Sequence, residues 1–257
     1  MLHHSHRLWR CFYLERGTCC RGDSMLSYQE DVLKEALNRL PGPLRIVFAA
    51  SCAQRLMGVY RASTERMCAP AAGLETALAY VWTHLGERLR REEAEQVLAD
   101  VMALIPDEDA PGWNPLTSYA ADAASAVAYA LRCLMSSDAQ EAAWAARRVY
   151  EALEHYVSSR NCMGPGDAAS EGRILGAPII QAGLRRQNRD LNDLQSAGAL
   201  NPGIIKISRR AAQSIKLWCW QVDLLLAEVI RDTAGCVCGT FAARSAAKNP
   251  HTLRYFS

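Results

Sequence analysis

Two charged residues lie among small and apolar neighbours, which makes them the leading candidates for a functional or fold-specifying role. Arg55 follows a largely apolar run, residues 44–50, and Asp122 lies in an alanine-rich stretch. A buried cation needs an anion, so we expect Arg55 and Asp122 to pair between two helices, where removing either charge would cost about 3–5 kcal/mol. The alternative is a polar pocket for a small ligand around Arg55, Tyr60, Trp82 and Asp122.

The sequence favours neither a metal site nor a catalytic nucleophile. A structural zinc site needs four ligands at organised spacing, which the histidines and cysteines near the two ends lack: His3, His4, His6, Cys11, Cys19, Cys20, Cys236 and Cys238. Cys52, His84 and His155 lie beside apolar helical positions, which is typical of inert thiols and of buried or surface imidazoles. The acidic run at 107–109 does not follow the calcium-loop pattern and suits a solvated turn.

The composition is that of a globular protein without a surplus of basic residues. Hydrophobic residues make up 50% of the 257 and charged residues 22%, which is enough apolar content for a substantial core. Residues 25–214 carry 20 Lys/Arg and 22 Asp/Glu, so the basic excess that phosphate contacts require is missing. We therefore expect no nucleic-acid partner.

Location and cofactors follow from what the sequence lacks. No segment has the roughly 20 apolar residues of a membrane span, and no secretory signal is visible. The ten cysteines are irregularly spaced, as expected for reduced thiols rather than a disulfide framework. No nucleophile-elbow, Walker or dinucleotide-binding motif occurs. These observations predict a cytoplasmic protein with no metal, no cofactor and no membrane span.

The elements that must position Arg55 and Asp122 are helices. Apolar residues recur at helical spacing in about seven or eight segments, including 44–67, 73–89, 117–135 and 178–197. Capping boxes are expected where Ser27 precedes Glu30 and where Ser137 precedes Gln140. Small side chains along 117–135 would allow close helix packing, which predicts a central helix there. The glycine-rich segment 161–176 is expected to be a loop or linker.

The sequence thus predicts an all-α fold, a single helical bundle-like domain with irregular N- and C-terminal extensions. Residues 1–24 form an irregular basic leader, residues 25–214 the all-helical domain, and residues 215–257 a C-terminal extension. Within the extension, residues 215–226 fit one amphipathic helix, followed by a disordered remainder. Such a helix would dock a partner or a membrane surface. We favour a weakly packed terminus.

An ordered set of short motifs resembles a bacterial family. They are the step formed by Cys52, Gln54, Arg55, Gly58, Val59 and Tyr60, and further along Val81-Trp82, Ile105-Pro106-Asp107, Ala121-Asp122-Ala123 and Ala177-Pro178-Ile179-Ile180-Gln181. Over residues 26–210 the chain is similar to the domain-of-unknown-function family 416, the YjaG-like proteins. At two positions this sequence departs from the family pattern: Gln54 stands where the family has an acidic residue, and Gly58 where it has a proline. The resemblance implies an all-helical cytoplasmic protein and supplies no reaction.

Two classes of function remain open at this point. The first, which we favour, is a non-enzymatic protein-interaction module that works through helical surfaces. An immunity-like role, in which the chain binds and blocks a toxin, is one concrete version. The second is a small-molecule-binding protein or enzyme with a polar pocket around Arg55 and Asp122. The sequence predicts no particular oligomeric state.

Overall fold

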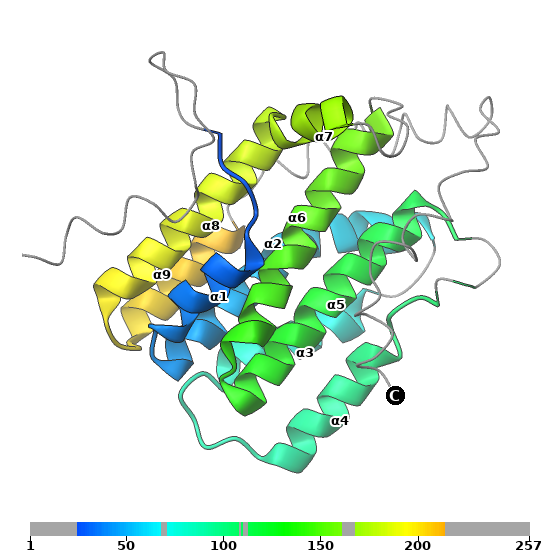
Figure 1. Cartoon of the computed structure of the whole chain (residues 1–257). Coiled ribbons are helices and arrows are strands. Elements are labelled where there is room, and N and C mark those ends of the chain that lie inside the picture. The colour runs from blue at the N-terminus through cyan, green and yellow to red at the C-terminus, as the bar shows by residue number, and fades with distance from the viewer. Residues whose placement is uncertain (1–24, 68–70, 108, 110–112, 161–167, 214–257) are drawn as a thin grey trace, which may run out of the picture.

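A computed structural model describes residues 25–67, 71–107, 109, 113–160 and 168–213. Within these residues the chain forms nine α-helices and no strand, so the prediction of an all-α fold is confirmed (Figure 1). The predicted leader 1–24 and extension 215–257 lie outside the described residues. The helices are α1 (Glu30–Asn38), α2 (Gly42–Arg66), α3 (Ala72–Thr83), α4 (Arg91–Met102), α5 (Pro115–Ser136), α6 (Ala139–Arg160), α7 (Ala168–Leu175), α8 (Pro178–Ala197) and α9 (Pro202–Gln213).

The core lies where α2, α5 and α6 pack against one another. Helix α2 is buried on nearly all sides, as expected for a helix whose apolar residues do not keep to one face. Helix α5 contributes a stripe of buried small residues, Ala120, Ala123, Ala124 and Ala128. Their lack of bulk lets α5 contact both α2 and α6 closely, so α5 is central, as its composition predicts, and shares that place with α2.

The remaining helices cover this three-helix core. Helices α3 and α4 pack on α5, whereas α1 packs on α6. Helix α9 packs mainly on α2, and α8 contacts α6, α2 and α9. In Figure 1 α8 and α9 therefore lie together on the side of the bundle away from α4. None of the described helices is long and apolar enough to cross a lipid bilayer.

Both predicted capping boxes are wrong. Helix α1 begins at Glu30, and its N-cap Gln29 makes no side-chain cap; the Glu30 carboxylate bonds to α6 instead of to the amide of Ser27. Ser137 ends α5 in a left-handed conformation with φ 56°. Asp138 caps α6, accepting a hydrogen bond from the Gln140 amide at 2.9 Å. Tertiary contacts thus take the side chains that the local pattern assigns to capping.

The segment at 161–176, predicted as a loop, contains helix α7. Its glycine content concealed a short run, Ala168 to Leu175, that can form two turns. Helix α2 also begins earlier than predicted, because Pro43 lies in its first turn, where a missing N–H costs nothing. Helix α7 is the element that raises the count to nine among the described residues, and the earlier start of α2 only lengthens a predicted helix.

Two side chains tie neighbouring helix ends together. The Arg45 guanidinium donates to the carbonyls of Leu37, Leu40 and Asn38 at 2.9–3.0 Å and to that of Ser137 at 2.8 Å. It thereby gives hydrogen bonds to carbonyls at and just beyond the C-terminal ends of α1 and α5, where the regular helical pattern of hydrogen bonds stops. Gln181 on α8 bonds both backbone groups of one residue: its Oε1 accepts from the Leu26 amide at 2.9 Å, and its Nε2 donates to the Leu26 carbonyl at 2.8 Å.

Candidate functional site

Helix α2 places Arg55 inside the molecule, facing α8. The Arg55 side chain is 3% exposed and forms an ion pair with Asp190, whose side chain is 10% exposed. Asp190 also forms an ion pair with Arg186, one turn earlier on α8, with Arg186 Nε 3.0 Å from Asp190 Oδ1. One carboxylate therefore serves two guanidinium groups. The expectation that Arg55 needs a buried anion is met, but by a residue that the sequence pattern did not indicate.

The electrostatics of Arg55 are those of an incompletely compensated cation. Burial lowers the pKa of Arg55 to about 10, the neighbouring Cys52 opposes that shift, and the positive charge of Arg186 adds to it. Arg55 Nη1 lies 3.8 Å from the Cys52 sulfur, and burial raises the pKa of the Cys52 thiol to about 11. A thiol with so high a pKa is a poor nucleophile, so Cys52 packs beside Arg55 rather than reacting.

Asp122 does not pair with Arg55, which corrects the prediction of that ion pair. Its side chain is 4% exposed and contacts two residues of α6 instead: Arg148 Nη1 lies 3.4 Å from Oδ1, and His155 Nδ1 lies 3.3 Å from Oδ2. The reason is topological, because α5 packs along α6 while Arg55 on α2 faces α8. Two separate buried polar clusters therefore replace the single predicted one.

Tyr60 and Trp82 belong to neither cluster. Tyr60 is 3% exposed, and burial raises the pKa of its phenol, with a further contribution from the charge of Glu75. Trp82 is 4% exposed; its indole N–H donates to Gln54 Oε1 at 3.2 Å, and the Arg209 guanidinium lies 5.9 Å from its ring centre. No hydrogen bond or ion pair joins any two of Arg55, Tyr60, Trp82 and Asp122. Ligand binding by these four residues stays a prediction.

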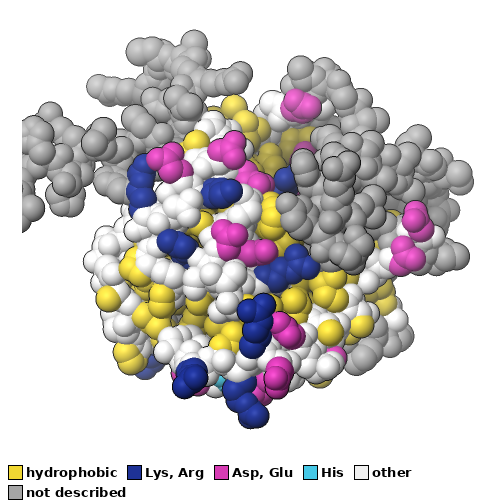
Figure 2. All heavy atoms as spheres, turned by 60° about the horizontal axis from the view of Figure 1, so that its bottom comes forward, with side chains coloured by type: hydrophobic (Ala, Val, Ile, Leu, Met, Phe, Trp, Pro, Cys, Tyr) yellow, Lys and Arg dark blue, Asp and Glu magenta, His cyan; other side chains and the backbone are white. Residues whose placement is uncertain are grey.

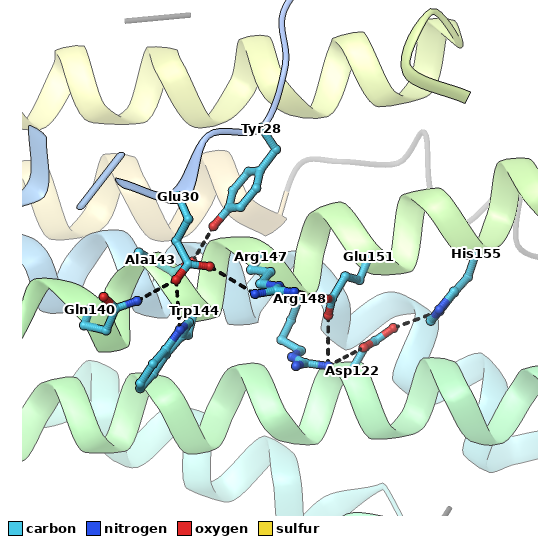
Figure 3. Close-up of polar contacts among 10 residues, drawn as sticks. All are labelled: Tyr28, Glu30, Asp122, Gln140, Ala143, Trp144, Arg147, Arg148, Glu151 and His155. Carbon is cyan, nitrogen blue, oxygen red and sulfur yellow. Dashed lines mark hydrogen bonds and ion pairs between the residues drawn. The ribbon is translucent and has the colours of Figure 1, made fainter. Parts of the chain in front are cut away.

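The Asp122 cluster is one end of a longer series of ion pairs that we call the α6 ion chain (Figure 3). Arg148 Nη1 also lies 2.9 Å from Glu151 Oε2, and Glu151 Oε1 lies 2.9 Å from Arg147 Nε. Arg147 Nη1 in turn lies 3.3 Å from Oε2 of Glu30 at the start of α1. The series therefore links α5, α6 and α1 through members of alternating charge: His155, Asp122, Arg148, Glu151, Arg147 and Glu30.

Two further donors fix the Glu30 end of this chain. Gln140 Nε2 and Trp144 Nε1 both donate to Glu30 Oε1, at 2.8 and 3.1 Å. Close by, the Tyr28 hydroxyl donates to the Ala143 carbonyl at 2.8 Å (Figure 3). The segment that precedes α1 is thus held to α6 through Tyr28, and the first turn of α1 through Glu30.

Sequence reasoning missed Asp190, Arg148 and Glu151. For Asp190 a signal was available, because it follows Leu184 and Gln187 on the inward face of α8, where a carboxylate needs a partner. The sequence pattern predicts a buried or surface imidazole at His155, and the structure places it against the Asp122 carboxylate. Within the described residues, no three histidine, cysteine or acidic side chains gather as a metal site would require. Asp107 instead accepts from the Asp109 amide at 3.1 Å, as in a local turn.

The fold and these clusters define a helical protein in which buried ion pairs join helices distant in sequence. Residues 32–215 match the family described as protein of unknown function (DUF416), and the chain belongs to that family. The fold is similar to the crystal structure of a DUF416 family protein from Shewanella baltica OS155, with a TM-score of 0.61 and 17% sequence identity. That match covers 70% of this chain and 92% of the other. No curated protein matches the chain.

Proposed function

We propose that this chain is a non-enzymatic protein-interaction module that binds an acidic partner through α8 and α9. Charge is unevenly divided along the described domain. Residues 178–213 carry six Lys/Arg and two Asp/Glu, whereas residues 25–177 carry 14 and 20. The α8–α9 hairpin is thus basic on an otherwise acidic domain, and a surface of one sign attracts and orients a partner of the other.

The observation that carries the proposal is the exposed Ile207 on α9. Ile207 is 61% exposed, and the adjacent Lys206 and nearby Arg210 are exposed as well. Ile204 and Ala212, by contrast, are buried on the part of α9 that faces the domain. An apolar side chain beside cations offers a partner both a desolvated anchor and charge complementarity. We call Lys206, Ile207 and Arg210 the α9 surface.

Other parts of the surface differ in charge pattern. Figure 2 shows a face on which basic and acidic side chains are interspersed, with hydrophobic side chains between them. On α4, for example, the exposed Arg90 and Arg91 have acidic partners one turn away, Glu93 at 4.0 Å and Glu95 at 2.8 Å. The α9 helix itself contains no acidic residue. An acidic protein segment therefore has more to gain at α9 than at α4.

The test compares charge reversal at the α9 surface with matched reversal on α4. A partner captured with the full chain is purified, and its affinity is measured for wild type, K206E/R210E, I207D and the control R90E/R91E. We expect the first two variants to bind at least about tenfold more weakly, a change of roughly 1.4 kcal/mol, and the control to match wild type. Equal affinity for wild type and K206E/R210E contradicts the proposal. Capture of a partner that nuclease treatment removes also contradicts it, because that partner would be a nucleic acid. An immunity-like role predicts that the partner is a toxin.

A second candidate function rests on the Asp122–His155 contact. A carboxylate that holds one imidazole nitrogen is the arrangement that orients a histidine general base, and the His155 side chain is 36% exposed. This favours a small-molecule-binding or enzymatic site centred on Asp122 rather than on Arg55. Screening of hydrolase substrates with wild type and H155Q tests it: we expect an activity that falls about 100-fold or more in H155Q. Activity that is equal in both proteins excludes His155 as the base.

A further inference from the structure

The α6 ion chain is one positive charge short when His155 is neutral. Its other members are three carboxyl groups, Asp122, Glu151 and Glu30, which carry three negative charges when ionised, and two guanidinium groups, Arg148 and Arg147. These five alternate in sign along the chain, beginning and ending on a carboxylate. His155 stands at the Asp122 end, so that an imidazolium there would complete the alternation and neutralise the series.

His155 is placed so that it can gain and lose a proton while the rest of the α6 ion chain stays in position. Each oxygen of the Asp122 carboxylate has its own neighbour, with Arg148 at Oδ1 and His155 at Oδ2. The Asp122 side chain is 4% exposed, whereas that of His155 is 36% exposed and can exchange protons with water. The buried carboxylate is thus fixed, and the imidazole connects it to solvent.

We propose that His155 is a pH-sensitive latch, whose protonation tightens the contact of α5 with α6 and, through Arg148, Glu151 and Arg147, the docking of α1. The latch operates at the seam shown in Figure 3, where one end of the chain is His155 and the other is Glu30. Loss of the proton leaves Asp122 with one cation of the chain, Arg148, whose Nη1 lies 3.4 Å from Asp122 and 2.9 Å from Glu151, while Glu151 keeps Arg147 as well. A carboxylate that shares one guanidinium nitrogen holds α5 less firmly than a carboxylate between two cations.

The charged groups around His155 favour the imidazolium. Burial by itself lowers the pKa of His155, but the hydrogen bond and charge of Asp122 on α5 and the charges of Glu151 and Glu154 on α6 outweigh burial, so the pKa is raised above its usual 6.5. Among the described residues, these are the groups that act on the imidazole, and all of them are acidic. Burial also raises the pKa of Glu151, against the opposing charge of Arg148.

The sign of the effect follows from linkage. A histidine whose pKa is higher in the folded protein than in the unfolded chain stabilises the fold fully below the unfolded pKa. That stabilisation is lost as the pH rises through the folded pKa of His155. The latch is therefore closed below about pH 6.5 and opens as the pH rises through the folded pKa of His155, which lies above 6.5.

The test uses the full chain and two histidine variants. Wild type, H155Q and H84Q are unfolded with urea at a series of values from about pH 5.5 to about pH 8.5, and the histidine rings are titrated by NMR in the wild type. His84 is the matched control, since it lies at the end of α3, where its Nδ1 is 2.9 Å from the Tyr80 carbonyl.

We expect the ratio of folded to unfolded protein to fall several-fold more across this range in wild type and H84Q than in H155Q. The ring of His155 should titrate above the usual histidine pKa of 6.5. In wild type, hydrogen exchange of the α1 and α5 amides should accelerate with pH by more than the intrinsic exchange rate does. In H155Q it should follow the intrinsic rate. A pH profile of H155Q that superimposes on that of wild type overturns the proposal, as does a His155 ring that titrates below its usual range.

Discussion

Arg55 on α2 forms its ion pair with Asp190 on α8, and both side chains are almost completely enclosed. This contact joins two helices that lie far apart in sequence. Buried pairs of this kind add little net stability relative to apolar residues, but they specify which surfaces meet. The pair therefore bears on how α8 is aligned with α2 more than on chemistry.

A double-mutant cycle should show that Arg55 is coupled to Asp190 and not to Asp122. Removing Asp190 strands the buried Arg55 and is expected to cost about 3–5 kcal/mol of unfolding free energy. Removing Arg55 should cost less, because Asp190 keeps Arg186 as a partner. The double variant R55M/D190L should lose less than the sum by at least about 1 kcal/mol. Urea unfolding measures all the terms. For R55M with D122N we expect additive losses, and a comparable coupling in that cycle would contradict the structure.

The burial of Glu141 should make the protein less stable as the pH rises. Burial raises the pKa of this carboxyl from 4.5 to about 7, Arg132 opposes that shift, and Asp138 adds to it. Because the folded pKa is the higher one, the stabilisation is fully present below pH 4.5 and is lost as the pH rises through about 7.

The variant E141Q should remove this contribution by keeping the side chain neutral. Urea unfolding of wild type and E141Q at about pH 5 and about pH 8 measures it, and we expect E141Q to become the more stable of the two at the higher pH. The exposed acid Glu95 on α4 offers a control, E95Q, which should follow the wild-type profile. A constant difference between wild type and E141Q would show that Glu141 titrates normally.

Two helical glycines should respond in opposite directions to replacement by alanine. A methyl group at Gly172 on α7 meets no atom within 4 Å, whereas one at Gly183 on α8 would lie 2.5 Å from Leu153 Cδ1. Alanine in place of glycine stabilises an open helix by about 1 kcal/mol, so G172A should raise the unfolding temperature. Overpacking costs about 1–3 kcal/mol, so G183A should lower it.

Calorimetry on G172A and G183A checks both directions. The two glycines act as controls for each other, since the chemical change is identical. If G183A stabilises the protein as much as G172A, then Leu153 moves aside without cost, and the close approach of α6 and α8 is not under packing constraint.

Apolar periodicity was sufficient to predict the long helices. Stretches such as α2 and α5 have many apolar positions in register, so their existence does not depend on any single residue. Helix α7 was missed because glycines and Pro165 surround it, and a two-turn helix has too few positions to show a period. The ends of α1 and α6 were misplaced because Glu30 and Gln140 bond to each other across the bundle rather than to local amides.

The sequence predicts that Arg55 and Asp122 are buried charges, but it does not predict their partners correctly. Burial of Arg55 and Asp122 followed from their neighbours, because a helix with few polar residues leaves them no solvated face. Their partners depend on which helices meet, and that information is distributed over the whole packing arrangement. Only the inward position of Asp190 beside Leu184 and Leu191 carried a local hint. The shared Arg148 contact of Asp122 and Glu151 had no counterpart in any short motif.

The contact of Gln181 with Leu26 allows the packing of α8 against the segment before α1 to be followed at one backbone position. The side chain of Gln181 forms hydrogen bonds with both the amide and the carbonyl of Leu26. If α8 separated from the segment before α1, both backbone groups would become exposed to water at the same time. The exchange rate of the Leu26 amide hydrogen is therefore a local gauge of α8 docking, and it can be followed without altering any residue of either cluster.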